Sequence, residues 1–331
     1  MKIITFEEHL LDPELSPAVN QITLEDAPYY GLTLGKDLPY YPDFDLYRDI
    51  AELRIADMDR HGIDMQVLSC PAQAGLLQGD EALPMVKKLN DRMAAAVQAH
   101  PDRYRAFAAL PWSAPEAAAA ELERAVTELG LSGALLAGRP VREALFLDDP
   151  AFSPILETAE RLNVPIYVHP GVPVPAVQDA YYARLDPEVS ARLSIFSWGW
   201  HNEAGIQVLR MVLAGVFDKH PNLQVISGHW GEFVPFYLSR LDQALPQKCT
   251  GLSTTITEAY AQHVYVTPSG IFDYPQLQFC ISVLGAERIL YSVDFPLIPH
   301  DGAREFIENA PISAADKEKI AFGNAEKLLN L

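Results

Sequence analysis

The sequence predicts an α/β protein and, within that class, a (β/α)8 TIM barrel with long loops at the carboxyl ends of its strands. Eight short apolar segments alternate with segments of helical periodicity along the 331 residues, and such alternation implies a parallel sheet. Four of the eight segments end in residues that can bind a metal, which is where the active site of such a barrel lies. No Gly-x-Gly-x-x-Gly follows any predicted strand, which disfavours the main alternative, an open nucleotide-binding sheet.

The predicted strands are short and rich in apolar and β-branched residues, as expected for strands buried on both faces. They span residues 3–9, 65–70, 104–110, 133–138, 165–169, 223–228, 264–267 and 289–293. The predicted helices span residues 46–61, 82–99, 115–129, 149–162, 204–217, 231–245 and 274–284, and two more, at 301–309 and 313–330, close the chain. We therefore expect residues 1–331 to form a single barrel domain.

Two long stretches, residues 10–50 and 170–203, interrupt this alternation and are predicted to be irregular. The first carries Tyr29, Tyr30, Tyr40, Tyr41, Phe44 and Tyr47, and the second Tyr181, Tyr182, Phe196, Trp198, Trp200 and His201. Loops of this length inside a compact domain are usually functional. A lid over a flat or apolar ligand and a surface for a partner protein are both open interpretations.

Composition excludes several classes of function. The net charge is −19 with a pI of about 4.8 and no cluster of basic residues, so neither nucleic acid nor an acidic membrane surface is an expected partner. No apolar run reaches the roughly 18 residues that a membrane helix needs. The first residues enter a strand at once, which predicts no signal peptide, and three cysteines without paired spacing favour free thiols in a reducing cytoplasm.

The strand ends carry the residues that point to a metal site. Glu7 and His9 are two apart at the end of the first strand, so on a regular strand they face the same side and Glu8 faces the other. His169 ends the fifth strand, His229 follows the sixth, and Asp294 follows the eighth. Because these ends converge in a barrel, we expect a divalent metal with mixed nitrogen and oxygen ligands, either Zn²⁺ or Mn²⁺.

The segments that carry these residues resemble those of the amidohydrolase superfamily. They read Glu7-x-His9, Tyr167-Val168-His169-Pro170, Ser227-Gly228-His229-Trp230-Gly231-Glu232 and Tyr291-Ser292-Val293-Asp294-Phe295-Pro296, with further similarity at residues 217–221 and 323–325. They are most similar to the non-oxidative decarboxylases, the branch that holds aminocarboxymuconate-semialdehyde, γ-resorcylate and dihydroxybenzoate decarboxylases. That branch usually begins with His-x-His, and the Glu7-x-His9 form is similar to the hydroxybenzoate enzymes.

The resemblance implies a role for each of these residues. Glu7, His9, His169 and Asp294 would bind one divalent metal ion, and His229 would be a catalytic group beside it, with Glu232 behind His229. No lysine ends the fourth strand, where Leu136-Ala137-Gly138 stands, so a second metal bridged by a carbamylated lysine is not expected.

The charge of such a site favours an anionic substrate. Two carboxylates and neutral histidines around one divalent ion give a net charge near zero, which suits a chelating acid better than the generation of hydroxide. A small aromatic carboxylate of the 2-hydroxybenzoate type could bind through its carboxylate and its ortho oxygen. Decarboxylation then needs a proton at the ring carbon, with Asp294 as the candidate acid and His229, oriented by Glu232, as the group that shuttles the proton or stabilises the phenolate.

One further residue is implied to bind the substrate. Arg240 lies in the predicted helix 231–245, four and eight residues after Phe236 and Glu232, so the three would share a helical face. Related decarboxylases use an arginine at this place near the substrate carboxylate, in some cases across a dimer interface, and they form homodimers or homotetramers. An ordinary surface ion pair is the alternative role for Arg240.

Two other functions fit the same residues. A hydrolase of an amide or lactone would use metal-bound water with Asp294 as the base, and a non-catalytic metal-binding or scaffold protein could share the barrel. Two segments, Asp294-Phe295-Pro296-Leu297 and Ser69-Cys70-Pro71, depart from the resorcylate enzymes, which leaves the hydroxyl pattern of the substrate ring open.

Overall fold

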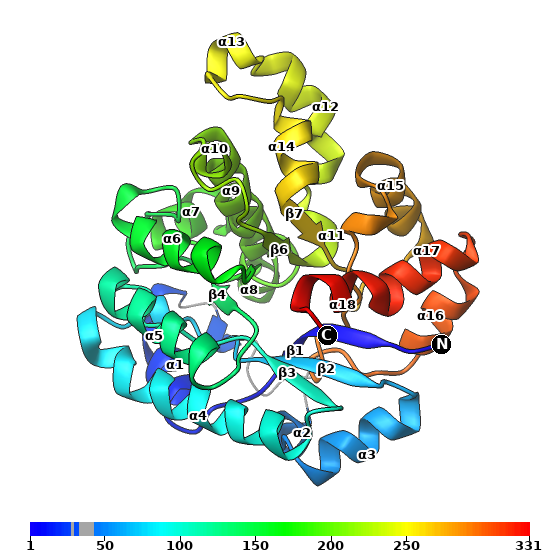
Figure 1. Cartoon of the computed structure of the whole chain (residues 1–331). Helices are drawn as coiled ribbons and strands as arrows, with labels where there is room; N and C mark the ends of the chain where they lie inside the picture. Colours follow the sequence, from blue (N-terminus) through cyan, green and yellow to red (C-terminus); the bar gives the residue numbers. More distant parts are fainter. Residues whose placement is uncertain (28–29, 33–42) are drawn as a thin grey trace.

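The computed structural model describes residues 1–27, 30–32 and 43–331. The strands run parallel around a central barrel, with helices outside (Figure 1). The regular strands are β1 (Ile4–His9), β2 (Met65–Ser69), β3 (Tyr104–Ala106), β4 (Ala134–Ala137), β5 (Ile166–His169), β6 (Val225–Ser227) and β7 (Val264–Val266). They pair in the orders β1-β2-β3 and β4-β5-β6-β7.

Isolated parallel bridges close these two sheets into one barrel. Ala108 pairs with Ala134 between β3 and β4, and Val266 pairs with Ile289 beyond β7. Ser292 then pairs with Phe6 of β1, and the amide of Phe6 donates to the carbonyl of Tyr291 at 2.9 Å. The predicted eighth strand, 289–293, is therefore present as a bridging segment rather than a regular strand, and the predicted (β/α)8 barrel is confirmed.

The helices are numerous and several are short. They are α1 (Leu15–Asp26), α2 (Phe44–Arg48), α3 (Glu52–His61), α4 (Leu83–Ala99), α5 (Pro115–Thr127), α6 (Ser153–Leu162), α7 (Pro175–Val177), α8 (Pro187–Ser194), α9 (Gly199–Leu213), α10 (Val216–Lys219), α11 (Gly228–Glu232), α12 (Val234–Ala244), α13 (Gln247–Thr250), α14 (Ile256–His263), α15 (Tyr274–Leu284), α16 (Ala303–Asn309), α17 (Ala314–Glu318) and α18 (Asn324–Leu329). Within the described residues, no helix combines the length and apolarity that a membrane crossing requires.

Where the structure describes them, the two stretches predicted to be irregular are largely helical, which corrects that prediction. Pro175 and Pro187 each occupy the first turn of a helix, where proline costs no hydrogen bond because its missing amide would be unpaired there. In the first stretch, Asp12 accepts hydrogen bonds from the amides of Glu14 and Leu15 and so opens α1. Tyr29, Tyr40 and Tyr41, also assigned to that stretch, lie outside the described residues.

Several predicted helices differ in extent from those observed. The helix expected over 313–330 consists of α17, a π-helical segment at 319–323 and α18. The helix expected over 46–61 is split into α2 and α3, and that over 204–217 begins earlier, as α9, and ends before Gly215, whose φ is +68°. The helix expected over 231–245 begins only at Val234, because residues 229–233 all have left-handed backbones.

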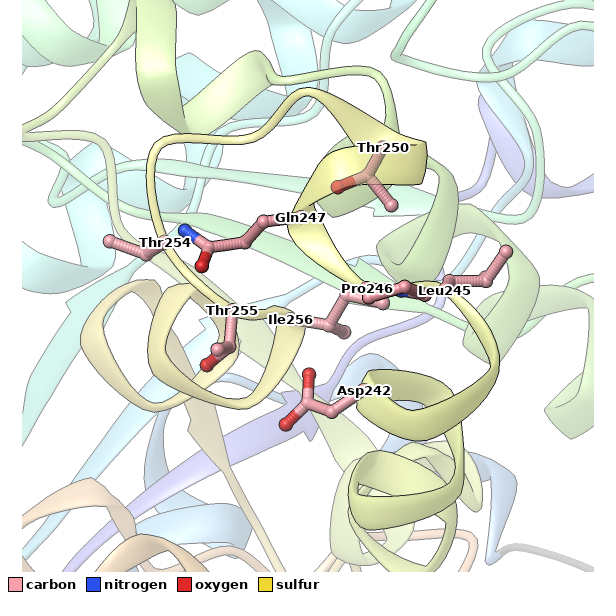
Figure 2. A pocket seen from close by; sticks show the side chains of 8 residues that line it. All are labelled: Asp242, Leu245, Pro246, Gln247, Thr250, Thr254, Thr255 and Ile256. Carbon is pink, nitrogen blue, oxygen red and sulfur yellow. The ribbon is translucent and has the colours of Figure 1, made fainter.

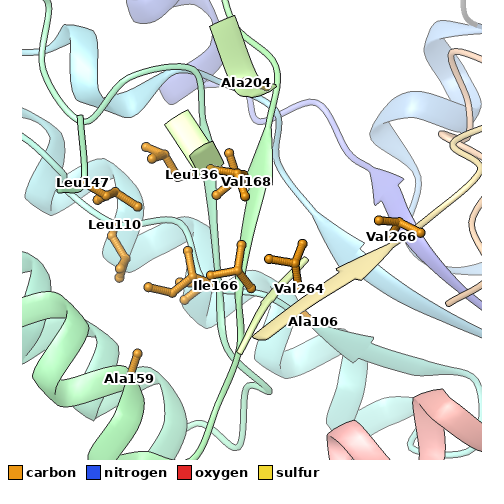
Figure 3. Packing of buried hydrophobic residues seen from close by; sticks show 14 of the residues in the cluster. Ala106, Leu110, Leu136, Leu147, Ala159, Ile166, Val168, Ala204, Val264 and Val266 are labelled. Carbon is orange, nitrogen blue, oxygen red and sulfur yellow. The ribbon is translucent and has the colours of Figure 1, made fainter. Parts of the chain in front are cut away.

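Alternate strand residues pack on opposite sides of the barrel wall. Ile166 and Val168 of β5 face the surrounding helices, in the packing shown in Figure 3, whereas Tyr167 between them belongs to the cluster inside the barrel. The inner cluster also contains Phe6 and, from α18, Ala325. The barrel therefore has a packed apolar interior, and the site lies at the carboxyl ends of the strands.

Candidate active site

Four predicted ligands meet at the carboxyl end of the barrel. One ligand atom from each of Glu7, His9, His169 and Asp294 lies within 4.8 Å of all the others. His9 Nε2 lies 3.2 Å from His169 Nε2 and 3.1 Å from Asp294 Oδ1, and His169 Nε2 lies 3.6 Å from Glu7 Oε1. The fold thus brings two imidazole nitrogens and two carboxylate oxygens from β1, β5 and the end of the eighth strand segment to one point.

Both histidines are held with their Nε2 atoms facing this point. His169 Nδ1 donates to the carbonyl of Pro170 at 2.8 Å, and His9 Nδ1 lies 3.0 Å from Ser69 Oγ. Metal-binding histidines commonly have an outer partner of this kind on their second nitrogen. Burial and the neighbouring His9 lower the pKa of His169 well below its usual value, so His169 is neutral, as a ligand must be.

The carboxylates each have an oxygen without a hydrogen-bond partner. In the described structure, Glu7 Oε1 and Asp294 Oδ1 are buried and accept no hydrogen bond, whereas Glu7 Oε2 accepts from Tyr167 Oη at 2.5 Å and from Ser269 Oγ. Buried polar atoms are rarely left unpaired in proteins. Both unpaired oxygens belong to the four-residue cluster, so the donor set fits a divalent cation.

Glu7 reaches the cluster by a route that the sequence does not predict. The pairing of β1 with β2 shifts register between Thr5 and Glu8, and Glu7 has a φ of +63°. Glu7 and His9 both enter the cluster. Regular strand alternation does not explain this, because the strand is irregular at Glu7. A bulge of this kind re-aims a side chain and is common beside active sites.

His229 and Glu232 lie on a left-handed turn. In α11 the φ angles of His229, Trp230 and Gly231 are 45°, 59° and 80°, and left-handed backbone costs roughly 1–2 kcal/mol per non-glycine residue. Hydrogen bonds hold the turn: the His229 amide donates to Ser269 Oγ at 2.9 Å, and the Trp230 amide donates to the carbonyl of Thr267 at 2.7 Å. Such strain is often maintained at functional sites.

A glycine on a neighbouring helix makes room for this turn. Helix α9 packs against α11, and a Cβ atom added to Gly205 would lie 2.4 Å from the backbone oxygen of Glu232. That approach is shorter than real Cβ contacts, so only glycine lets α9 come this close to the turn.

The turn places charged groups beside the four ligands and nearest to one of them, Asp294. His229 Nδ1 donates to Glu232 Oε1 at 2.7 Å, and His229 Nε2 lies 3.9 Å from Asp294 Oδ2. Burial alone would lower the pKa of His229, but the charges of Glu232 and Glu7 hold it well above its usual value. Burial would likewise raise the pKa of Asp294, whereas the neighbouring imidazoles of His229 and His9 lower it to about 2.

The pKa of the other carboxylate ligand, Glu7, shifts in the opposite direction because the effect of burial prevails there. Burial raises the pKa of Glu7 to about 7, against the opposing charge of His229. Without a cation, Glu7 is thus readily protonated, unlike Asp294. A bound cation would favour the ionised form of both carboxylates.

Sequence reasoning missed three residues of the site. His201, noted only among the aromatic residues of 170–203, lies with its Nδ1 2.9 Å from Glu232 Oε2. Ser269 and Thr267 join the hydrogen bonds around Glu7 and Tyr167. Ser269 and Thr267 follow β7 closely, and this position could have indicated them, because every βα loop of a barrel reaches the same face.

Arg240 is not brought to this cluster. It is exposed on α12, outside the buried group formed by the other predicted residues, and Glu232 precedes α12, so the two do not share a helical face. A small cavity of about 130 Å³ lies between α12, α13 and α14, away from the site (Figure 2). It is lined by Asp242, Leu245, Pro246, Gln247, Thr250, Thr254, Thr255 and Ile256.

The fold and the site together define a barrel with a histidine–carboxylate centre of the kind that binds a divalent metal. Comparison with known families identifies the family of the chain. Residues 13–331 match the model of the amidohydrolase family, and the chain belongs to that family.

The most informative relatives are decarboxylases. The chain is 36% identical to a γ-resorcylate decarboxylase of Polaromonas sp., over 99% of this chain and 98% of that one. A dihydroxybenzoic acid decarboxylase from Polaromonas, solved with manganese and the inhibitor 2-nitroresorcinol, superposes with a TM-score of 0.86 at 34% identity, covering 100% and 97% of the two chains. A 5-carboxyvanillate decarboxylase from Novosphingobium aromaticivorans, solved with manganese and 4-hydroxy-3-methoxy-5-nitrobenzoic acid, gives 0.88 at 28% identity over 100% and 96%.

Proposed function

We propose that this protein is a metal-dependent, non-oxidative decarboxylase of a hydroxylated aromatic acid of the 2-hydroxybenzoate type. The observation that carries the proposal is the convergence of Glu7, His9, His169 and Asp294 at one point beside the His229–Glu232 pair, in a chain similar over nearly its full length to aromatic-acid decarboxylases. Residues 1–331 act as one unit in this proposal.

The four clustered residues would hold one divalent ion. Two manganese-containing relatives favour Mn²⁺ over Zn²⁺, and the donor set of two nitrogens and two oxygens accommodates either ion. When bound, the ion supplies a template for the substrate's carboxylate and ortho oxygen and stabilises negative charge there. Substitution of each metal into metal-free protein, followed by activity measurement, distinguishes the two ions.

The chain's own residues supply the proton. His229, whose pKa is raised, holds a proton on Nε2, the nitrogen facing Asp294. Asp294 takes that proton and delivers it to the ring carbon that bears the carboxylate, while Glu232 keeps the His229 ring in place. Carbon dioxide leaves as the ring carbon gains hydrogen, so no oxidant is needed.

Carbon dioxide release and deuterium incorporation test this function. With a panel of hydroxybenzoic acids in deuterated water, we expect carbon dioxide and a product deuterated at the carbon that lost the carboxylate. Asp294→Asn should slow turnover by roughly 10²–10⁴-fold, as for loss of a general acid. Hydrolysis of amides or lactones without carbon dioxide release would instead identify a hydrolase.

Self-association is the remaining part of the proposal. An aromatic patch of Trp198, Phe233, Phe236 and Tyr237 is exposed near the start of α12, with Phe236 70% exposed, and a second copy of the chain covering it would form a homodimer or homotetramer. Arg240, on the same helix, could then reach a partner's site. Sedimentation at micromolar concentration should give a dimer or larger species; a monomer would contradict this and exclude Arg240 from a shared site.

We further propose a cytoplasmic location, which cell fractionation would test.

A further inference from the structure

The carboxylate of Glu232 is shared by two histidines. One oxygen, Oε1, accepts from His229 Nδ1 at 2.7 Å, and the other, Oε2, lies 2.9 Å from His201 Nδ1. Glu232 is 2% exposed and His201 is 9% exposed. Burial would raise the pKa of Glu232, but the charges of His229 and His201 lower it, so an ionised carboxylate is held between two imidazole donors.

His201 is itself fixed by its surroundings. Its Nε2 atom lies 2.9 Å from the carbonyl oxygen of Phe196 and 3.0 Å from the indole nitrogen of Trp200. Its ring meets the ring of His229 at 64°, with the centroids 4.4 Å apart. These contacts fix the orientation of the His201 ring independently of its hydrogen bond to Glu232.

Helix α9 contacts the left-handed turn at two places on one face. His201 and Gly205 are four residues apart on α9, and residues at that spacing lie above one another on a helix. Gly205 sits against the backbone oxygen of Glu232, while His201 binds the carboxylate of the same residue. The backbone and the side chain of Glu232 are thus both placed by α9.

From this geometry we propose that His201 is a positioning residue for the proposed decarboxylase. It holds the Glu232 carboxylate in the rotamer that presents Oε1 to Nδ1 of His229. That hydrogen bond orients the His229 ring with Nε2 toward Asp294, so His201 acts through Glu232 and His229 and touches no reacting atom. This inference rests on the function proposed above.

Loss of His201 would leave Oε2 of a buried carboxylate without a partner. An unpaired buried polar group is costly, so Glu232 would turn toward water or another donor and would hold His229 less firmly. His201→Leu removes the donor at similar volume. His201→Asn retains it, because an asparagine amide nitrogen occupies nearly the place of Nδ1.

His220 provides a matched control at the other end of the barrel. It precedes β6, is 8% exposed, and its Nδ1 lies 3.0 Å from Glu160 Oε2, so it forms a histidine–glutamate pair of the same kind. His220→Leu should destabilise the fold to a similar degree while leaving turnover unchanged. Comparison of the two leucine variants separates positioning from structural support.

The test measures kcat and KM for carbon dioxide release, together with crystal structures of the variants. We expect His201→Leu to lower kcat by roughly 10- to 100-fold, the range typical of lost outer partners at such sites, with KM within about twofold and metal content unchanged. His201→Asn should recover most of kcat, and the His201→Leu crystal should show the Glu232 carboxylate turned from His229.

Two outcomes would overturn the inference: a His201→Leu protein with wild-type kcat and an unmoved Glu232, or an equal loss of kcat in His220→Leu. Failure of the wild-type protein to release carbon dioxide would refute the proposed function instead. In that case the orientation of Glu232 in the His201→Leu crystal would still decide what His201 does.

Discussion

Glu7 and Glu8 are adjacent, both are fully buried, and they have opposite surroundings. One oxygen of Glu7 has no hydrogen-bond partner in the described structure. Both oxygens of Glu8 are paired: Oε1 accepts from the Val293 amide at 3.1 Å and Oε2 from Gln66 Nε2 at 3.3 Å. Glu7 faces three other candidate metal ligands, whereas Glu8 faces donors supplied by the protein.

The surroundings of Glu8 form a continuous polar network. Arg54, which is 0% exposed, donates to Gln66 Oε1 at 3.3 Å and to the carbonyl of His9. Gln66 contacts His300 Nε2 at 2.9 Å, and His300 Nδ1 donates to Asp57 at 2.7 Å. Because Glu8 also accepts a hydrogen bond from the Val293 amide, the network holds the start of the Asp294 segment.

Burial alone does not distinguish the two carboxylates. Burial raises the pKa of both residues, that of Glu8 well above its usual range, so the pKa direction does not separate them. The unpaired oxygen does, because it lies among three other candidate metal ligands, whereas both oxygens of Glu8 bind donors of the protein.

The largest expected effect comes from removing a ligand of the Glu7 cluster. His169→Ala should lose the metal ion and about 10³-fold or more in turnover, since charge stabilisation by the ion is worth several kcal/mol. Metal analysis and circular dichroism should show a folded, metal-poor protein. Full turnover in protein stripped of metal would contradict the proposed site.

A pair of matched substitutions tests the comparison directly. Glu7→Gln should weaken metal binding by more than the roughly 10- to 100-fold typical of an outer partner. Glu8→Gln should leave metal affinity unchanged and cost about 1 kcal/mol of stability for one altered hydrogen bond. Titration with Mn²⁺ and thermal unfolding of both variants provide the measurements; equal metal loss in both would remove the distinction drawn between the two residues.

A smaller effect is expected at the phenol that supports Glu7. Tyr167→Phe removes the 2.5 Å hydrogen bond to Glu7 Oε2 and should lower metal affinity by roughly 10- to 100-fold. Tyr104→Phe is the control, because in the described structure the buried Tyr104 hydroxyl has no hydrogen-bond partner. The prediction fails if the two variants bind Mn²⁺ equally well.

The smallest effect concerns pH and the Glu8 network. Burial lowers the pKa of His300, so this group contributes stability that is present above the unfolded pKa of about 6.5 and is lost as pH falls toward the folded pKa. For one proton the slope is at most about 1.4 kcal/mol per pH unit. Between pH 8 and pH 5, the midpoint temperature of thermal unfolding should therefore fall less steeply for His300→Gln than for wild type. Parallel curves of midpoint against pH would show that His300 does not titrate in this way.

The barrel and the clustered strand-end residues follow from the sequence because both depend on local pattern. Apolar runs mark strands, and in a barrel any strand's carboxyl end reaches the same face, so the five strand-end residues can be grouped without knowing their distances. The family resemblance, and not the pattern, separates His229 from the four ligands. His201 and Gly205 do not follow, because they matter only where α9 meets a left-handed turn. Apolar and helical periodicity do not specify left-handed backbone at His229 or Trp230, which depends on tertiary hydrogen bonds.

The turn at 228–232 also limits how this site could be moved to another scaffold. A design that copies Ser227-Gly228-His229-Trp230-Gly231-Glu232 into a different barrel would relax to ordinary backbone unless the helix that fits against it came too. Gly205 accommodates the turn, and Ser269 and the Thr267 carbonyl bind its amides. The smallest transplantable unit is therefore β6 with its turn, the first two turns of α9 and the residues after β7, three pieces that are distant in sequence and must be grafted as one.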